Sequence, residues 1–207
     1  MILASGSPRR RELLSQLGLS PIVRPSDIDE TPLPGESPTQ LVLRLARQKA
    51  HACERDLPAG LQGQTVIAAD TTVWFRDVEL GKPTDAADAR RMLGMLSGHT
   101  HHVSTGVAIV RAGEERSFVE TSDVTFYELT PGQIDAYVQS GEPMDKAGAY
   151  GIQGLGRLLV REIRGDYFNI VGLPLARLAR ELEAMAADGP RGNTPTLCDI
   201  LEGRSHA

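Results

Sequence analysis

Short apolar segments alternate with helical patterns along most of this chain, and one long hairpin interrupts the alternation. Strand-like runs at 21–24 and 65–75 are separated by a segment with helical periodicity. Further on, 103–111 and 118–127 flank Ala112-Gly113, as the strands of an antiparallel hairpin flank a tight turn. Alternation favours parallel strands with helices on the faces of the sheet, whereas the hairpin requires antiparallel strands. The sequence therefore predicts an α/β fold with a mixed sheet.

The predicted helices begin with clear start signals. Ser7-Pro8, Ser37-Pro38 and Thr130-Pro131 each place a hydroxyl N-cap directly before a proline, which is favoured at the first helical position. Glycines follow the expected ends of several helices, where they are common. The expected helices cover about 8–17, 38–55, 86–96, 131–140 and 174–186.

The length and the two ends of the chain limit its class. With 207 residues it fits one large domain or two closely packed lobes. No stretch holds the roughly 20 apolar residues of a membrane helix, and Met1–Ala4 is too short for the apolar part of a signal peptide. Periodicity stops at about Ala187, so we expect 187–207 to form a loosely ordered tail. Cys53 and Cys198 are interpreted as free thiols, and the expected location is the cytoplasm.

The net charge argues against nucleic-acid binding. The chain carries 22 Lys and Arg residues against 27 Asp and Glu residues, for a formal charge of −5 at pH 7. A protein that binds DNA or RNA usually has a basic surplus. Any polyanion that this protein binds must therefore meet a local cluster of Lys and Arg side chains.

A first candidate site lies where the strand at 1–4 meets a helix. The small residues 5–7 precede the helix start, where free backbone N–H groups and the helix dipole attract anions. Arg9 and Arg10 add forked donors that suit phosphate oxygens. The segment is not a Walker A loop, because it lacks the second glycine and the Lys-Ser/Thr pair. We interpret it as a candidate phosphate site, and the alternative is an ordinary capped helix with solvated arginines.

Two carboxylates and two lysines form a second set of candidates. Asp70 follows a buried apolar strand, where α/β folds place ligand-binding groups and where an unpaired carboxylate is costly. Lys49 lies on or beside the apolar stripe of its helix, and Glu30 and Lys82 lie in loops. Carboxylates suit a divalent cation such as Mg²⁺, and the lysines suit phosphate. Each residue taken singly also has a simpler interpretation. Asp70 fits the cap of the next turn, and Glu30 fits a solvated surface charge. Lys49 fits a side chain whose ammonium group extends to water.

A glycine-rich segment, DKAGAYGIQGLG at 145–156, is a third candidate. Its glycines allow the backbone to approach a ligand closely, and Gln153 can pair with a base edge through both amide atoms. The alternative is a plain loop before the strand expected at 158–163. The histidines within 99–102 lie close in sequence but lack nearby further ligands for a structural zinc.

Seven segments together resemble one known family, the Maf-like nucleoside triphosphate pyrophosphatases. They cover about residues 2–186 in order, and only the tail falls outside. The segments are LASGSPRRRELL at 3–14, LARQKA at 45–50, AADTTV at 68–73, GKP at 81–83, MLSGHTHHVSTGVA at 95–108, DKAGAYGIQG at 145–154 and GDYFNIVGLPL at 165–175.

The resemblance implies a fold and an activity. The fold would be one α/β domain over 1–186 with a long, curved mixed sheet and two lobes around a central cleft, similar to inosine triphosphatase. The activity would be hydrolysis of a nucleoside triphosphate to its monophosphate and pyrophosphate, with Mg²⁺ or Mn²⁺ as cofactor. Nucleic-acid and membrane partners are not expected, and a homodimer is suggested by the resemblance alone. The alternative functions are a nucleotide-binding regulator of cell division with little turnover and a 7-methyl-GTP-type pyrophosphatase.

The resemblance also assigns roles to individual residues. Glu30 and Asp70 would be the acidic catalytic residues, as metal ligands or, for Asp70, as the base. Lys49 and Lys82 would also be catalytic, as the lysines that contact the phosphates, and Ser7, Arg9 and Arg10 would bind the phosphates of the substrate.

Three positions divide the family into branches. Arg9, Thr71 and Gln153 resemble the branch that acts on dTTP and UTP, whereas the branch that acts on 7-methyl-GTP has Trp, Gln and Glu there. Thr72 stands where the resemblance leads us to expect an aliphatic residue. The resemblance therefore predicts a pyrimidine substrate, with Thr71 and Gln153 contacting its base.

Overall fold

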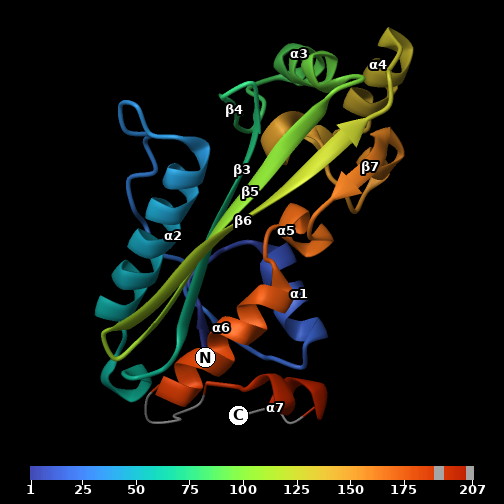
Figure 1. Ribbon diagram of the computed structural model, residues 1–207. Helices are drawn as coiled ribbons and strands as arrows, with labels where there is room; N and C mark the ends of the chain where they lie inside the picture. Colours follow the sequence, from blue (N-terminus) through green and yellow to red (C-terminus); the bar gives the residue numbers. More distant parts are fainter. Residues whose placement is uncertain (189–193, 204–207) are drawn as a thin grey trace. The chain divides into compact units, whose positions relative to one another are not determined.

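The computed structural model describes residues 1–188 and 194–203 (Figure 1). Its strands are β1 Ile2–Leu3, β2 Ile22–Val23, β3 Val66–Phe75, β4 Val78–Leu80, β5 Thr100–Arg111, β6 Glu114–Phe126 and β7 Val160–Arg164. Its α-helices are α1 Pro8–Gln16, α2 Pro38–Arg55, α3 Ala86–Leu96, α4 Pro131–Gln139, α5 Tyr167–Val171, α6 Leu175–Asp188 and α7 Leu197–Leu201. Short 3₁₀ turns cover Ala59–Leu61, Glu142–Asp145, Ala147–Ala149 and Leu155–Leu159.

The strands form one mixed sheet, which confirms the predicted fold class. Its order is β2-β1-β3-β5-β6-β7, with β4 paired to β3. β1 runs parallel to β2 and β3, whereas β4 is antiparallel to β3 and β7 is antiparallel to β6. The hairpin between β5 and β6 turns at Ala112 and Gly113, with φ of 50° and 84°. Positive φ at both positions gives the turn a twist that matches the strands, and the turn lies at the two residues where the sequence predicted it.

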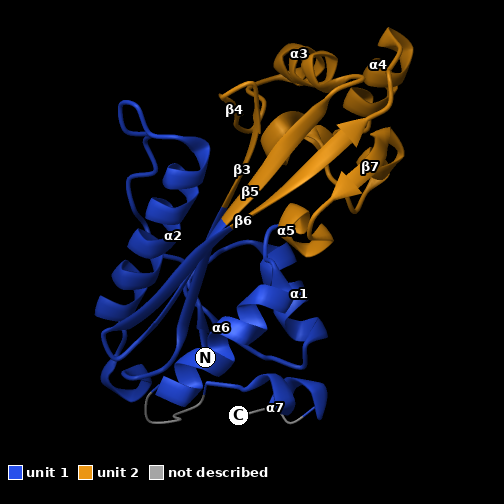
Figure 2. Cartoon of the chain, in the orientation of Figure 1, with its two compact units in different colours: residues 1–70, 106–119, 172–207 blue, residues 71–105, 120–171 orange. Residues whose placement is uncertain are grey.

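The chain divides into two compact units, coloured separately in Figure 2. Unit 1 holds residues 1–70, 106–119 and 172–207, and unit 2 holds residues 71–105 and 120–171. β3, β5 and β6 each contribute residues to both units. The predicted arrangement of two lobes around a cleft stays a prediction.

Unit 1 has helices on both sides of its strands, with α2 on one side and α1 and α6 on the other (Figure 2). α2 packs through a tightly buried, small-residue interface. Gly106 of β5 lies against the α2 backbone, since an added Cβ would come within 2.2 Å of the Val42 carbonyl oxygen. The buried residues of this interface are Ile2, Ala4, Ala46, Ala50, Cys53, Leu57, Val66, Ala68, Ala108 and Val110.

Unit 2 has its own core, built from the outer parts of β3, β5 and β6 with α3 and α4. Phe126, Leu93 and Leu96 are among its fully buried side chains. Thr72 is 2% exposed and donates its hydroxyl hydrogen to Glu79 Oε1 at 2.8 Å. A buried threonine with a carboxylate partner is satisfied, which explains how it replaces the expected aliphatic residue.

The helix starts follow the sequence closely. Ser7 accepts from Arg10 N, and Ser37 and Thr130 each form a complete capping box with the glutamine three residues later. Asp85 caps α3 through its side chain alone, which accepts from Asp88 N. Capping depends on neighbours within one turn, which is why sequence alone located these ends.

The structure differs from the sequence-based expectation near the C-terminus. The strand expected at 158–163 begins only at Val160, because Leu155–Leu159 form a 3₁₀ turn, and the short helix α5 was not predicted. Within the expected tail, Thr194 is buried and bonds Thr65 and Arg111, and α7 follows it. Residues 189–193 and 204–207 of that tail lie outside the described residues.

Candidate active site

Lys49 and Asp70 are brought together by the packing of α2 on the sheet of unit 1. Residues two apart in a strand share one face, so Asp70 lies on the face of Ala68, which packs against α2. Lys49 lies three residues after Ala46 and four before Cys53, on the face of α2 that meets the sheet. At one end of the apolar interface between α2 and the sheet, the ammonium group of Lys49 therefore faces the carboxylate of Asp70.

Lys49 binds two carboxylates at once. Its Nζ lies 2.7 Å from Asp70 Oδ1 and 2.7 Å from Glu30 Oε1. The side chains of Lys49 and Asp70 are 12% and 16% exposed, whereas that of Glu30 is 58% exposed. Three of the predicted residues, one each from a loop, a helix and a strand, therefore lie within ion-pair distance of one another.

The turn between β1 and α1 carries the arginines of the candidate phosphate site. Arg10 is half-buried, and it donates from Nε to the Gly172 carbonyl at 2.9 Å and from Nη1 to Ser5 Oγ at 3.0 Å. Burial lowers the pKa of Arg10 from its usual value, and the negative charges of Asp70 and Glu30 oppose that shift. Arg10 therefore lies in the field of the same two carboxylates that Lys49 bridges.

Ser7 and Arg9 occupy the same turn. Ser7 Oγ accepts from Arg10 N at 3.5 Å, and Ser7 N donates to Ser5 Oγ at 3.3 Å. Arg9 is half-buried on the first turn of α1, and its charge lowers the pKa of Arg10 further. The capped helix is present, Arg10 is held by protein partners, and binding of phosphate by this segment stays a prediction.

Thr71 lies in unit 2 and belongs to a hydroxyl chain that the sequence did not reveal. Its Oγ1 lies 2.9 Å from Thr105 Oγ1, which in turn donates to the Asn169 carbonyl at 3.1 Å. A carbonyl can only accept, so the Thr105 hydrogen is used there and Thr71 must donate to Thr105. The Thr71 oxygen is consequently oriented as a hydrogen-bond acceptor toward its other neighbours.

Lys82 and Gln153 also belong to unit 2. Both are exposed, and Gly148 N donates to the Gly81 carbonyl at 3.1 Å beside Lys82. Gly148 has a φ of 68°, and a Cβ there would meet Val73 at 2.8 Å, so only glycine suits this turn.

Sequence reasoning missed Glu142 and Tyr137, which contact the glycine-rich segment that carries Gln153. Tyr137 donates its hydroxyl hydrogen to Glu142 Oε1 at 2.9 Å, and Glu142 also accepts backbone N–H bonds from that segment. Neither residue stands in a recognisable local pattern. The available signal was the spacing of the glycines, which leaves room for a group from elsewhere.

A sequence model of the family described as Maf-like protein matches residues 1–185. The chain belongs to this Maf family. A relative from Halalkalibacterium halodurans is 50% identical over 183 residues, which cover 88% of this chain and 94% of the relative. A relative from Anaeromyxobacter dehalogenans is 53% identical over 183 residues, covering 86% of this chain and 90% of the relative. A Bacillus cereus relative is 48% identical over 188 residues, covering 91% and 96%.

All three Maf-family relatives carry the name dTTP/UTP pyrophosphatase. The predicted family is thereby confirmed, and the match includes every candidate residue from Ser7 to Gln153. Within the described part of the chain, no helix has the length and apolar character required to cross a bilayer.

The acidic pair of this Maf-family chain fits a hard divalent cation. Asp70 and Glu30 present carboxylate oxygens that already converge on one positively charged atom, Lys49 Nζ. Mg²⁺ is typically held by one or two carboxylates, with water and substrate phosphates as further ligands. No group of three His, Cys, Asp or Glu side chains is gathered within 1–188 and 194–203, as a cage made by the protein alone would require.

The histidines and the buried cysteine have structural partners. His101 Nε2 lies 2.9 Å from the Tyr150 hydroxyl, and His102 Nδ1 lies 2.8 Å from Asp123 Oδ1. Cys53 Sγ donates to the Arg24 carbonyl, and burial raises the pKa of this thiol. A raised thiol pKa disfavours the reactive thiolate, so Cys53 is suited to packing rather than to nucleophilic attack.

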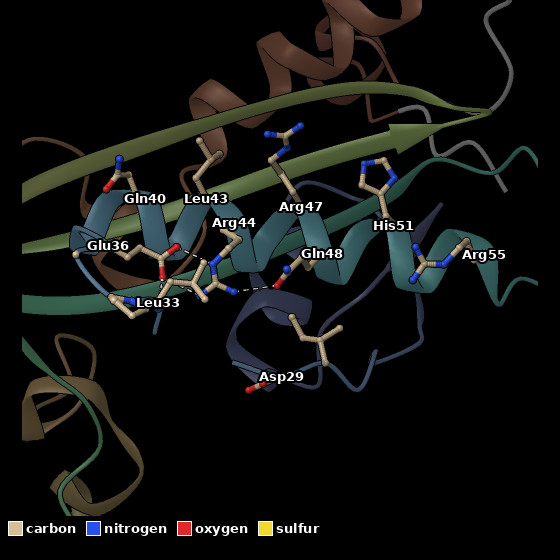
Figure 3. A pocket seen from close by; sticks show the side chains of 13 residues that line it. Asp29, Leu33, Glu36, Gln40, Leu43, Arg44, Arg47, Gln48, His51 and Arg55 are labelled. Atoms are coloured by element: carbon tan, nitrogen blue, oxygen red, sulfur yellow. Dashed lines mark hydrogen bonds and ion pairs between the residues drawn. The ribbon is translucent and has the colours of Figure 1, made fainter. Parts of the chain in front are cut away.

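A surface pocket of about 1000 Å³ runs along the outer side of α2 (Figure 3). Arg44 lies at its centre, where Nε and Nη2 bind the two carboxylate oxygens of Glu36 at 2.6 and 2.8 Å. None of the predicted site residues lines this pocket. The converging charges of Lys49, Asp70 and Glu30, rather than this pocket along α2, therefore define the candidate site.

Proposed function

We propose that this Maf-family protein hydrolyses dTTP and UTP to the nucleoside monophosphate and pyrophosphate. The observation that carries the proposal is the bridge from Lys49 to both Asp70 and Glu30, each at 2.7 Å. A nucleotide-binding protein without turnover does not need a paired set of carboxylates beside its phosphate cations. The names of relatives about 50% identical support the same substrates.

In the proposed reaction, water attacks the α-phosphorus and pyrophosphate leaves. Asp70 accepts a proton from that water or positions it, and the two roles are alternatives. Arg9, Arg10, Lys49 and Lys82 neutralise the charge that builds on the leaving pyrophosphate. Placement and charge stabilisation can supply most of the rate in phosphoryl chemistry, because little covalent help from the protein is needed.

Asp70 and Glu30 would hold a divalent cation, Mg²⁺ or Mn²⁺, whose charge lowers the cost of negative charge on the phosphates. Ser7 contributes its backbone and hydroxyl to the phosphate end of the nucleotide. Thr71 and Gln153 read the pyrimidine edge. A cytoplasmic location and a homodimer remain parts of the same proposal.

A substrate panel with an Asp70→Asn variant tests the proposal. Wild-type protein should release pyrophosphate from dTTP and UTP faster than from CTP, GTP or 7-methyl-GTP, measured with a coupled inorganic pyrophosphatase. Asp70→Asn should lose at least about a hundredfold in turnover while still binding nucleotide, since it removes charge and basicity at the reacting water.

Asp77→Asn is the matched control, because it makes the same chemical change at an exposed turn residue with a φ of 62°, which asparagine tolerates. Its turnover should equal that of wild type. Release of single phosphates with a diphosphate product would contradict the proposal. Tight binding of nucleotide without turnover across the whole panel would favour the regulatory alternative instead.

A further inference from the structure

The loop that carries Gln153 folds around one carboxylate, that of Glu142. Glu142 Oε2 accepts from Leu155 N at 2.7 Å, and Oε1 accepts from Gly156 N at 3.2 Å. Glu142 itself lies at the start of a 3₁₀ turn that follows α4. Residues 151–156 are therefore anchored to a side chain that comes from a different part of unit 2.

The glycines of this loop are required by that carboxylate and its neighbours. A Cβ on Gly154 would lie 2.3 Å from Glu142 Oε1, and a Cβ on Gly151 would lie 2.7 Å from Lys146 Cε. Real Cβ atoms do not approach so closely, and backbone groups reach the carboxylate only because these positions lack side chains. The glycine spacing thus reflects how tightly the loop closes on Glu142.

Tyr137 completes the arrangement from α4. Its hydroxyl donates to Glu142 Oε1 at 2.9 Å and accepts from Gly151 N at 3.0 Å. Tyr137 is 6% exposed, and burial with the nearby carboxylate raises its pKa, so the hydroxyl keeps the hydrogen that it donates. One carboxylate and one phenol therefore satisfy the backbone N–H groups of Gly151, Leu155 and Gly156.

Gln153 lies in the middle of this anchored loop and is exposed. Within the described residues, neither a hydrogen bond nor an ion pair fixes its side chain. The direction of the side chain is consequently set by the backbone on either side. There, Gly151 N donates to the Tyr137 hydroxyl and Leu155 N donates to Glu142. Gly154, between these two residues, lies in direct contact with the Glu142 carboxylate.

We propose that Glu142, supported by Tyr137, is a positioning residue for pyrimidine recognition: it fixes the 151–156 loop so that the Gln153 amide meets the base edge in one orientation. This inference rests on the proposed function, in which Gln153 reads the base. Glu142 acts through the loop and not on the reacting phosphate. It therefore affects which nucleotide is used more than how fast a bound nucleotide is cut.

Glu142→Gln tests this role, because the amide keeps the size of the carboxylate but turns an NH₂ group toward N–H donors. kcat/KM for UTP should fall at least about tenfold, mainly through a higher KM, since hydrogen bonds to a charged acceptor are among the stronger ones. kcat/KM for GTP should stay within about twofold of the wild-type value. Tyr137→Phe leaves the carboxylate in place. It should lower the ratio of kcat/KM for UTP to kcat/KM for GTP by a smaller factor than Glu142→Gln does.

Amide hydrogen exchange gives a second reading that does not depend on activity. The amides of Leu155 and Gly156 should exchange at least about tenfold faster in Glu142→Gln than in wild type, because their acceptor is altered. Val138→Ala serves as the control, since it removes buried apolar atoms from α4 but none of the groups that hydrogen-bond the backbone of the 151–156 loop. This variant should leave unchanged both the ratio of kcat/KM for UTP to that for GTP and the exchange rates of the Leu155 and Gly156 amides.

The outcomes separate this inference from the proposed function. A wild-type protein without preference for dTTP or UTP would overturn the proposed function and with it the role in recognition. A wild-type preference that survives in Glu142→Gln, or loop amides that exchange as in wild type, would overturn the inference alone. An equal loss with UTP and GTP would show a general structural role and would also overturn it.

Discussion

Lys49 shows how charge is balanced at the scale of single residues. One ammonium group holds two carboxylates at 2.7 Å each, and Arg10 lies in the field of the same acids. With Arg9 included, this cluster of unit 1 carries one net positive charge. A triphosphate brings several negative charges, so the cluster alone is too weakly positive to neutralise it. The proposed divalent cation and the proposed phosphate contact of Lys82 would supply the positive charge that this cluster lacks.

His101 makes a prediction about pH at the same scale. It is fully buried against Tyr150, and burial followed by the nearby charge of His102 lowers its pKa to about 3. The unfolded chain binds a proton below a pKa of about 6.5, whereas folded His101 does not until about pH 3. Stability contributed by neutral His101 is therefore complete above pH 6.5 and falls as the pH decreases.

The expected slope is about 1.4 kcal/mol per pH unit below the unfolded pKa, which amounts to about 2 kcal/mol between pH 7.5 and pH 5. His101→Gln should lack this component because glutamine does not titrate. The free energy of unfolding, measured in urea at several pH values, checks it. Wild type and variant with parallel stability curves from pH 7.5 to pH 5 would refute this account of His101.

At the scale of elements, the contact between α2 and β5 controls where Lys49 lies. Gly106 lets the two backbones touch, since a Cβ there would approach the Val42 carbonyl oxygen to 2.2 Å and Leu43 N to 2.6 Å. Backbone atoms of a helix cannot move aside individually. Any side chain at position 106 must therefore shift α2 as a body, and with it the ammonium group that bridges Asp70 and Glu30.

Gly106→Ala should lower the free energy of unfolding by about 1–3 kcal/mol through overpacking. It should also reduce turnover of UTP at temperatures where the protein is still folded. Gly60→Ala is the control, because nothing lies within 4 Å of the Cβ it adds. Both can be followed by urea denaturation and by pyrophosphate release. A Gly106→Ala protein as stable and active as the control would show that α2 does not rest on β5 in this way.

At the scale of the whole molecule, ligand binding should raise stability by mass action. A ligand that binds only the folded chain adds RT ln(1 + [L]/Kd), or about 2.7 kcal/mol at one hundred times Kd. We expect this gain from the α,β-imido analogue of dUTP, which resists cleavage, in the presence of Mg²⁺. Inorganic tripolyphosphate, which lacks the base, should give a smaller gain at equal concentration. Equal gains from both would argue against recognition of the pyrimidine.

The sequence by itself determined the features that depend on near neighbours. Caps at Ser7, Ser37 and Thr130 and the turn at Ala112-Gly113 follow from interactions within a few residues. The order of the motifs also identified the family, because each of the seven segments can be recognised from its own residues alone. These signals do not need the rest of the fold in order to be recognised.

The tertiary structure alone decided how distant side chains pair. Lys49 and Asp70 are 21 residues apart, and Arg10 reaches Gly172 across 162 residues. Glu142 was not predicted, because its partners are backbone N–H groups that any sequence possesses. The acceptor orientation of Thr71 likewise depends on a carbonyl of α5. Such contacts arise from packing between elements, which a local pattern does not record, and packing therefore fixed the geometry on which the proposed chemistry depends.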